Sequence, residues 1–286
     1  YKQWNELKAY ANEEGIEIIG DVPIYVAGDS ADVWANPDQF YLDENLEPIE
    51  VAGCPPDAFS DDGQLWGNPQ YNWEVMKQDG YDWWIRRFRN LMRQVDIIRI
   101  DHFRGFESFW EVDGDAKTAE HGVWKPGPGK AFFDIIRKDI GDIPIVAEDL
   151  GVITNEVEEL RQACQFPGMK ILQFELHFNE NGRINFVEPE DCIVYTSTHD
   201  NNTMVGWLKE NASRAEVEAI ANMLGVPGAT PEELGKKLVE HAYASEARMA
   251  IIAMQDVLGL DGQHRMNLPG TADGNWSWRM KPGMLT

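Results

Sequence analysis

The sequence has 286 residues, of which 26% are charged and 43% are hydrophobic, and this size allows one large domain with a substantial core. Its 49 acidic residues outweigh its 25 basic residues, and the net charge of −24 argues against nucleic acid or an anionic membrane surface as a partner. Three widely spaced cysteines predict neither a disulfide framework nor a zinc site, which favours a reducing, cytoplasmic location.

Strand-like and helix-like segments alternate along the chain. Apolar spacing predicts a first helix at 4–14, ahead of any strand, and the chain does not begin with methionine, so we expect a piece of a longer protein. Apolar runs predict strands at 17–26, 96–102, 143–148, 170–176, 192–198 and, more weakly, 265–268. Helices are predicted at 81–95, 132–139 and 156–163, and two capping-box patterns predict helix starts at Ser213 and Thr230. This alternation is typical of a parallel β/α architecture.

Two insertions are predicted within this pattern. The segment 27–71 reads as a long irregular loop, and loops of such length inside compact domains are usually functional. Most of the 11 tryptophans are expected in the core or as loop anchors, but Phe59 and Trp66 are predicted to stack on sugar rings. The segment 201–258, between the fifth and sixth predicted strands, is expected to form a helical insertion on the catalytic side.

Carboxylates directly follow three of the apolar runs, at Asp101, Glu148 and Asp200. Enzymes built on a β/α barrel carry their catalytic groups at the C-terminal ends of several parallel strands. The sequence therefore predicts an active site at these strand ends.

The chemistry of these carboxylates suits glycoside cleavage with retention, which needs one carboxylate nucleophile and one carboxylic acid. Arg99 lies two residues before Asp101 and shares its strand face, so its cation favours an ionised nucleophile there. Glu148 is followed by Asp149, and crowding of like charges predicts a raised pKa that suits a general acid. His199 and Asp200 would then bind substrate hydroxyls.

Two other interpretations of these residues stay open at this point. Each strand-end motif can be structural, as a salt bridge at Arg99 and Asp101 or as a helix N-cap at Asp149 or Asp200. A metal-dependent hydrolase is the other alternative, and its candidate ligands are Asp101, His102, Glu148, His199 and Asp200.

Six motifs, in this order along the chain, carry a resemblance to a known family. They are GDVPIYVA at 20–27, PPD at 55–57 through NP at 68–69, RIDHFRG at 99–105, AEDLG at 147–151, THDN at 198–201, and RMNLPGT at 265–271 with GNW at 274–276. They resemble the 4-α-glucanotransferases, also called amylomaltases or disproportionating enzymes, of glycoside hydrolase family 77 in the α-amylase clan. The resemblance runs from Trp4 to Met280.

This resemblance implies an α/β fold, a (β/α)8 barrel of which strands three to eight are present, as one catalytic domain over 1–286. It implies retaining transfer of α-1,4-glucan segments between maltooligosaccharides or glucans derived from starch or glycogen, with neither cofactor nor metal. The implied catalytic residues are Asp101 as nucleophile, Glu148 as general acid/base and Asp200 as the carboxylate that stabilises the transition state. The implied sugar contacts are Asp21, Arg99, His199, Phe59 and Trp66.

The family's members are longer at the N-terminus, where the first two barrel strands lie. Six strands alone would leave two open edges, so we expect either a fragment or a companion chain that completes the barrel. The chain also has Ala58 where some members carry an aromatic residue, which affects long or cyclic glucans. An α-glucan hydrolase and an inactive glucan-binding fragment remain alternatives.

Overall fold

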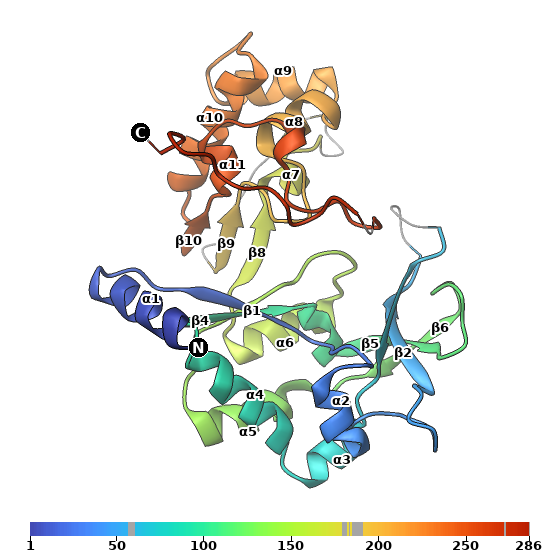
Figure 1. Ribbon diagram of the computed structural model, residues 1–286. Helices are drawn as coiled ribbons and strands as arrows, with labels where there is room; N and C mark the ends of the chain where they lie inside the picture. The colour runs from blue at the N-terminus through green and yellow to red at the C-terminus, as the bar shows by residue number, and fades with distance from the viewer. Residues whose placement is uncertain (57–60, 179–181, 183, 185–190, 272, 286) are drawn as a thin grey trace. The chain divides into compact units, whose positions relative to one another are not determined.

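Parallel strands alternate with helices in the computed structural model, which describes residues 1–56, 61–178, 182, 184, 191–271 and 273–285 (Figure 1). The chain divides into two compact units, Tyr1–Pro167 (unit 1) and Gly168–Thr286 (unit 2). In the described part of the chain, no helix is long and apolar enough to cross a membrane.

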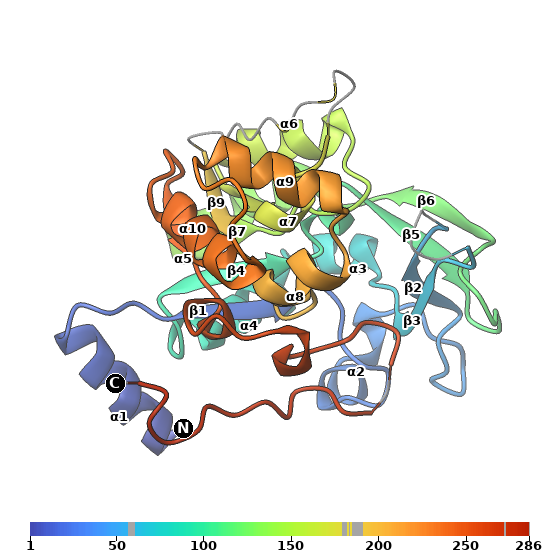
Figure 2. The same cartoon turned by 90° about the horizontal axis from the view of Figure 1, so that it is seen from above.

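Unit 1 contains two separate sheets. Its parallel sheet has the strand order β1-β4-β7, and its antiparallel sheet has the order β3-β2-β5-β6 and lies to one side of the parallel sheet in both views (Figures 1 and 2). The elements are α1 (Lys2–Glu13), β1 (Ile19–Pro23), α2 (Ala31–Ala35), η1 (Pro37–Gln39), β2 (Glu50–Cys54), β3 (Gln64–Pro69), α3 (Trp73–Gln78), α4 (Asp82–Met92), β4 (Ile97–Asp101), η2 (Phe103–Phe106), β5 (Ser108–Asp113), β6 (Gly122–Pro126), α5 (Gly129–Ile140), β7 (Ile145–Ala147) and α6 (Asn155–Cys164), where η denotes a 3₁₀ helix.

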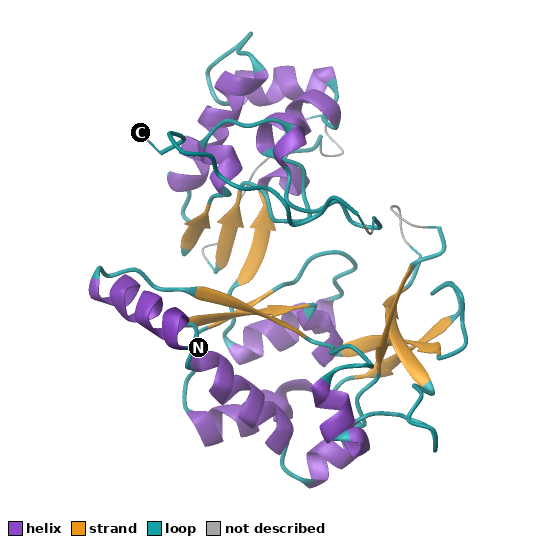
Figure 3. Cartoon of the chain, in the orientation of Figure 1, coloured by secondary structure: helices purple, strands orange, loops and turns teal. Residues whose placement is uncertain are grey.

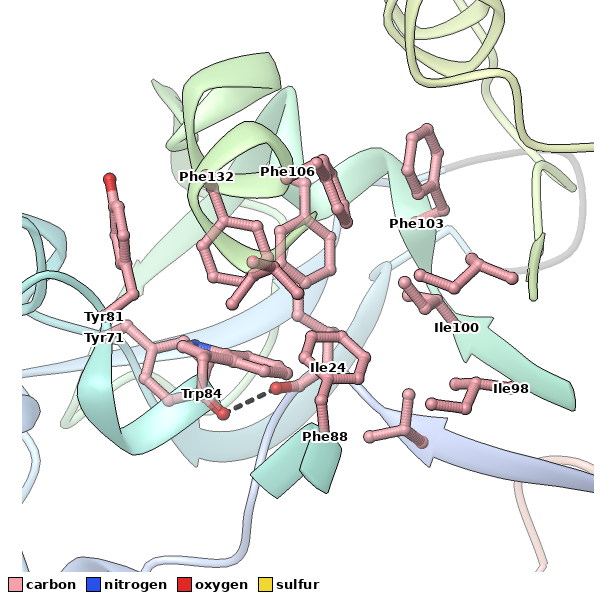
Figure 4. Close-up of a cluster of buried hydrophobic side chains, with 14 of the residues drawn as sticks. Ile24, Tyr71, Tyr81, Trp84, Phe88, Ile98, Ile100, Phe103, Phe106 and Phe132 are labelled. Carbon is pink, nitrogen blue, oxygen red and sulfur yellow. Dashed lines mark hydrogen bonds between the residues drawn. The ribbon is translucent and has the colours of Figure 1, made fainter. Parts of the chain in front are cut away.

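The central strand β4 directs apolar and polar side chains to opposite faces of the parallel sheet. Ile98 and Ile100 are buried, and because side chains alternate along a strand, Arg99 between them points to the other face. The isoleucines belong to a core that includes Trp84 of α4 and Phe132 of α5 (Figure 4). The helices thus cover one face of the sheet, and the opposite face is left for polar residues.

Unit 2 has a parallel sheet of strand order β10-β9-β8 with helices packed against it (Figure 3). Its elements are β8 (Gly168–Ile171), α7 (Leu172–Glu175), β9 (Cys192–Tyr195), α8 (Met204–Glu210), α9 (Arg214–Met223), α10 (Pro231–Tyr243), β10 (Met249–Ile251), α11 (Met254–Val257) and η3 (Gly262–His264). The two predicted capping boxes are present: Ser213 and Glu216 close the start of α9, and Thr230 and Glu233 close the start of α10.

Several predicted boundaries need correction. The prediction of a sixth strand at 265–268 is wrong, because the strand that pairs with β9 is β10, Met249–Ile251. The third of these residues, Asn267, instead donates its backbone N–H to the backbone oxygen of His199 in a loop. The predicted strand at 170–176 ends at Ile171 and continues as α7. The predicted irregular loop 27–71 contains α2, η1, β2 and β3.

Each parallel sheet has three strands, so neither unit closes a barrel by itself, and the described residues form a mixed α/β fold. The strands that carry the predicted carboxylates are parallel within each unit. The ends of these strands are therefore where a site can form.

Candidate active site

The polar face of the parallel sheet in unit 1 carries a cation between two carboxylates. The strand register sets Asp21 of β1 beside Arg99 of β4, and Asp101 follows two residues later on the same face. Arg99 Nη1 lies 2.7 Å from Asp21 Oδ1 and 2.9 Å from Asp101 Oδ1. Although burial opposes the charge of Arg99, these two carboxylates raise the pKa of its guanidinium. Arg99 therefore stays cationic and holds both acids in place.

Glu148 follows β7 directly, and main-chain groups hold its carboxyl group at both oxygens. Its Oε2 accepts a hydrogen bond of 2.7 Å from the His102 N–H, and its Oε1 accepts one of 2.8 Å from the Leu150 N–H. Burial raises the pKa of Glu148 to about 7 and the charge of Asp101 adds to this, while Arg99 and the two N–H donors act in the opposite direction. At neutral pH, Glu148 can therefore both give and accept a proton.

The raised pKa of Glu148 agrees with the sequence prediction, but its cause differs. We expected crowding by Asp149, whereas the Asp149 carboxylate faces Arg161 of α6, with Arg161 Nε 3.2 Å from Asp149 Oδ2. The charges that act on Glu148 come from Asp101 and Arg99 instead. The pKa of Glu148 thus depends less on its neighbour in the sequence than on the charged residues at the end of the adjacent strand β4.

Trp66 of β3 lies beside this strand end, in contact with His102. The two rings are perpendicular, with centroids 4.8 Å apart, and Trp66 remains 37% exposed. Tyr25 also contacts Trp66, at 6.2 Å between ring centroids. An exposed indole at this position offers a surface on which a sugar ring can stack.

A second group of predicted residues follows β9 in unit 2. His199 Nε2 lies 3.3 Å from Asp200 Oδ2, and Asn267 Nδ2 donates a hydrogen bond of 2.6 Å to Asp200 Oδ1. Arg265 Nη2 donates to the backbone oxygen of Asp200 at 2.9 Å, and the Trp276 ring lies 5.1 Å from that of His199. The segment that we predicted as a sixth strand therefore braces the loop that carries His199 and Asp200.

The structure thus gathers the predicted residues into two groups. Asp21, Arg99, Asp101, Glu148 and Trp66 lie around the β4 end in unit 1, and His199 with Asp200 lies in unit 2. The predicted sugar contact Phe59 falls outside the described residues.

Sequence reasoning missed five contributions to these groups: the main-chain donors at His102 and Leu150, the side-chain donors at Arg265 and Asn267, and the ring of Trp276. All five lie in the sequence motifs shared with the family, so the motifs were the available signal. Their contacts could not be derived from spacing along the chain.

The candidate ligands of the metal-dependent alternative lie in both units, with Asp101, His102 and Glu148 in unit 1 and with His199 and Asp200 in unit 2. Over the ranges that the structure describes, no group of three or more His, Cys, Asp and Glu side chains is arranged to hold a metal ion. The arrangement in unit 1 suits proton transfer beside an ion-paired carboxylate, because Glu148 titrates near neutrality and Arg99 accompanies Asp101.

A family model for 4-alpha-glucanotransferase, glycoside hydrolase family 77, matches residues 1–286. The chain belongs to this family. This family 77 chain is 52% identical to the 4-alpha-glucanotransferase of Synechocystis sp., and the match covers 100% of the chain and 57% of that relative. It is 46% identical to the Thermus thermophilus 4-alpha-glucanotransferase, and the match covers 100% of the chain and 58% of that relative. Amylomaltase from Streptococcus agalactiae in complex with acarbose has a similar structure, with a TM-score of 0.93 and 43% identity, and the match covers 100% of the chain and 58% of that structure.

The family 77 chain therefore spans a little over half the length of the relatives that it matches. In these relatives the matching region is part of one longer chain, which gives no support for a separate companion chain. An amylomaltase from Corynebacterium glutamicum, 19% identical, shares the fold with a TM-score of 0.75.

Proposed function

We propose that this chain carries catalytic groups of a retaining 4-α-glucanotransferase that acts on maltooligosaccharides and on glucans derived from starch or glycogen. The observation that carries the proposal is Glu148, whose pKa is about 7, beside the Arg99–Asp101 ion pair. Retaining glycoside cleavage needs an ionised nucleophile and a protonated acid. At neutral pH, Asp101 can supply the first and Glu148 the second.

In the first step, a carboxylate oxygen of Asp101 forms a bond to the anomeric carbon of the donor sugar as the glycosidic bond breaks. Glu148 gives its proton to the leaving oxygen, so the shortened glucan departs with a hydroxyl group. The neighbouring Arg99 favours the carboxylate form of Asp101 before attack.

In the second step, the 4-hydroxyl of an acceptor sugar attacks the anomeric carbon, and the bond to Asp101 breaks. The ionised Glu148 accepts the hydroxyl proton and so returns to its starting state. A pKa near 7 suits both directions of this transfer, because neither protonation state is strongly disfavoured at neutral pH.

The remaining roles rest on the family motifs. We propose Asp200 as the carboxylate that stabilises the transition state, and Asp21, Arg99 and His199 as contacts to the sugar beside the scissile bond. Phe59 and Trp66 are proposed sugar contacts of the substrate-loop insertion at 27–71, and the exposed indole of Trp66 agrees with this role.

Transfer rather than hydrolysis requires that an acceptor hydroxyl reach the covalent intermediate before water does. An acceptor held at attacking distance has a high effective concentration, and a loop that excludes water increases this advantage. An α-glucan hydrolase would use the same carboxylates, so product analysis must separate the two activities.

We also propose a finer fold and a location. The three parallel strands of each unit support strands three to eight of a (β/α)8 barrel within one catalytic domain, with β10 as the last of them. The helical insertion that the sequence predicts at 201–258 then corresponds to α8, α9 and α10, which precede β10. The three cysteines, Cys54, Cys164 and Cys192, are an odd number and widely spaced along the chain, which favours a reducing compartment such as the cytoplasm. The Solanum tuberosum relative, by contrast, is chloroplastic or amyloplastic.

The test is incubation of the chain with maltotriose, followed by separation of products by chain length. Glucose with a ladder of longer maltooligosaccharides is the expected result. Glucose and maltose alone would indicate a hydrolase, and saccharide binding without turnover would indicate a glucan-binding fragment.

A second measurement identifies the nucleophile. A fluorinated α-glucosyl fluoride, whose glycosyl-enzyme hydrolyses slowly, should leave a covalent sugar on the peptide that contains Asp101. The matched Asp101→Asn variant should stay unlabelled, and a label on any other residue would contradict the assignment.

A further inference from the structure

His102 adopts a backbone conformation that L-residues rarely use. Its φ of 53° and ψ of 50° lie in the left-handed region, which is uncommon for a residue other than glycine. This turn directs the His102 N–H toward Glu148 Oε2 at 2.7 Å, and the next N–H, of Phe103, donates to the Glu148 backbone oxygen at 3.1 Å. The conformation of His102 therefore helps to set the position of Glu148.

The imidazole of His102 fills a closely packed space. The Trp66 ring stands perpendicular to it at 4.8 Å between centroids. A Cβ at position 105 would lie 3.3 Å from His102 Cδ2, so the absence of a side chain at Gly105 leaves room beside the ring. The ring thus contacts Trp66 and lies near the backbone at Gly105, and these neighbours help to keep histidine at a position where glycine would be unstrained.

The imidazole of His102 acts as a packing group and not as an acid or a base. Its Nε2 is buried and has no hydrogen-bond partner among the residues that the structure describes. Burial, and secondarily the charge of Arg104, lowers the pKa of His102 to about 3, so the ring is neutral whenever Glu148 can act as an acid.

We propose that His102 is a positioning residue: its ring, held by Trp66 and Gly105, keeps water from the Glu148 carboxyl group and fixes the turn whose N–H groups hold Glu148. The proposal rests on the proposed function only for its catalytic consequence. The groups that act on Glu148 are Asp101 and Arg99 of β4 and the N–H donors of His102 and Leu150. None of these is removed by a change of the side chain at position 102.

The experiment compares His102→Gly with His102→Phe. Glycine keeps the left-handed turn but removes the ring, so water gains access to Glu148, and its pKa should fall by about one pH unit because burial is the largest cause of its rise. Phenylalanine restores an apolar ring without nitrogen, so the pKa should return to near the wild-type value. The pKa is measured by a ¹³C NMR titration of carboxyl groups, with the Glu148 signal identified by its loss in Glu148→Gln.

The matched control is Gln165→Gly. Gln165 also has a left-handed backbone, with φ of 60°, at the C-terminal end of α6, so this change relieves similar strain without removing a ring beside Glu148. It should leave the Glu148 titration unchanged. Circular dichroism checks that each variant is folded.

Two results would overturn the proposal: an unchanged or higher pKa of Glu148 in His102→Gly, or a His102→Phe variant that titrates like the glycine variant. The second result would mean that an imidazole nitrogen is needed. The titration does not depend on turnover, so an inactive wild-type chain would contradict the proposed function alone. In an active chain, the His102→Gly variant should transfer about fivefold more slowly at pH 7, since about a tenth of Glu148 would stay protonated.

Discussion

Replacement of Glu148 by glutamine should change how stability depends on pH. The folded protein holds the proton of Glu148 up to about pH 7, whereas in the unfolded chain the pKa is near its ordinary value of 4.5. Between these values the folded state binds more protons than the unfolded state, so the free energy of unfolding falls as pH rises. At about 1.4 kcal/mol per pH unit, the buried carboxylate costs about 3 kcal/mol of stability above pH 7.

The Glu148→Gln variant lacks this ionisation. Glutamine has one acceptor oxygen for the two N–H donors of His102 and Leu150, so the variant also loses some stability at every pH. The pH-independent loss cancels when two pH values are compared. Relative to wild type, the variant should therefore gain roughly 2–3 kcal/mol between pH 5 and pH 8.

Urea unfolding at these two pH values, followed by the fluorescence of the buried Trp83 and Trp84, measures the effect. Glu159→Gln on α6 is the matched control, because Glu159 is exposed and its change should leave the pH dependence as in wild type. An equal pH dependence in wild type and Glu148→Gln would refute the reasoning, since it would mean that Glu148 ionises alike in both states.

Three further changes test other parts of the structure. Asp200→Asn should slow transfer by about 100-fold or more while maltooligosaccharide binding weakens less, as separate kcat and KM values would reveal; unchanged kinetics would make Asp200 a structural residue. Trp84→Ala removes a fully buried ring that contacts Phe88 and Phe132, so it should cost about 3–5 kcal/mol in urea unfolding, and a loss under 1 kcal/mol would contradict the described core. Ser213→Ala should cost about 1 kcal/mol through loss of the α9 cap, and an unchanged melting temperature would argue against that cap.

Local signals predicted much of the fold. The alternation of Ile98, Arg99 and Ile100 marks β4 and its two faces, and the capping pairs at Ser213 and Thr230 mark helix starts within one residue. Such signals act over a few residues, so they survive in any tertiary context.

The misplaced sixth strand reflects a non-local choice. The three-residue run of β10, Met249–Ile251, follows a helix closely and is too short to stand out from it. The run at 265–268 has apolar residues at alternate positions, yet its polar groups bond to the loop of His199 and Asp200 instead of a strand. Which run pairs with β9 depends on contacts made across unit 2, and periodicity cannot supply these.

For the candidate site too, some contacts could be predicted from the sequence and others could not. Arg99 and Asp101 could be paired from their spacing, because two residues on one strand share a face. The partners of Glu148 could not, since its pKa reflects burial and a carboxylate 47 positions away along the chain, while Asp149 next to it turns to Arg161. Where parallel strands end side by side, residues that are far apart in the sequence can interact electrostatically more strongly than neighbours in the sequence do.

The attachment of Glu148 to main-chain N–H groups separates two properties that usually change together. Its position depends on the backbone of His102 and Leu150, which most side-chain substitutions leave in place, whereas its acidity depends on neighbouring side chains and on access of water. Substitutions around this carboxyl group can therefore shift its pKa while the group stays in place. If Glu148 is the acid of the proposed transfer, changes at its neighbours alone would shift the pH optimum of that reaction.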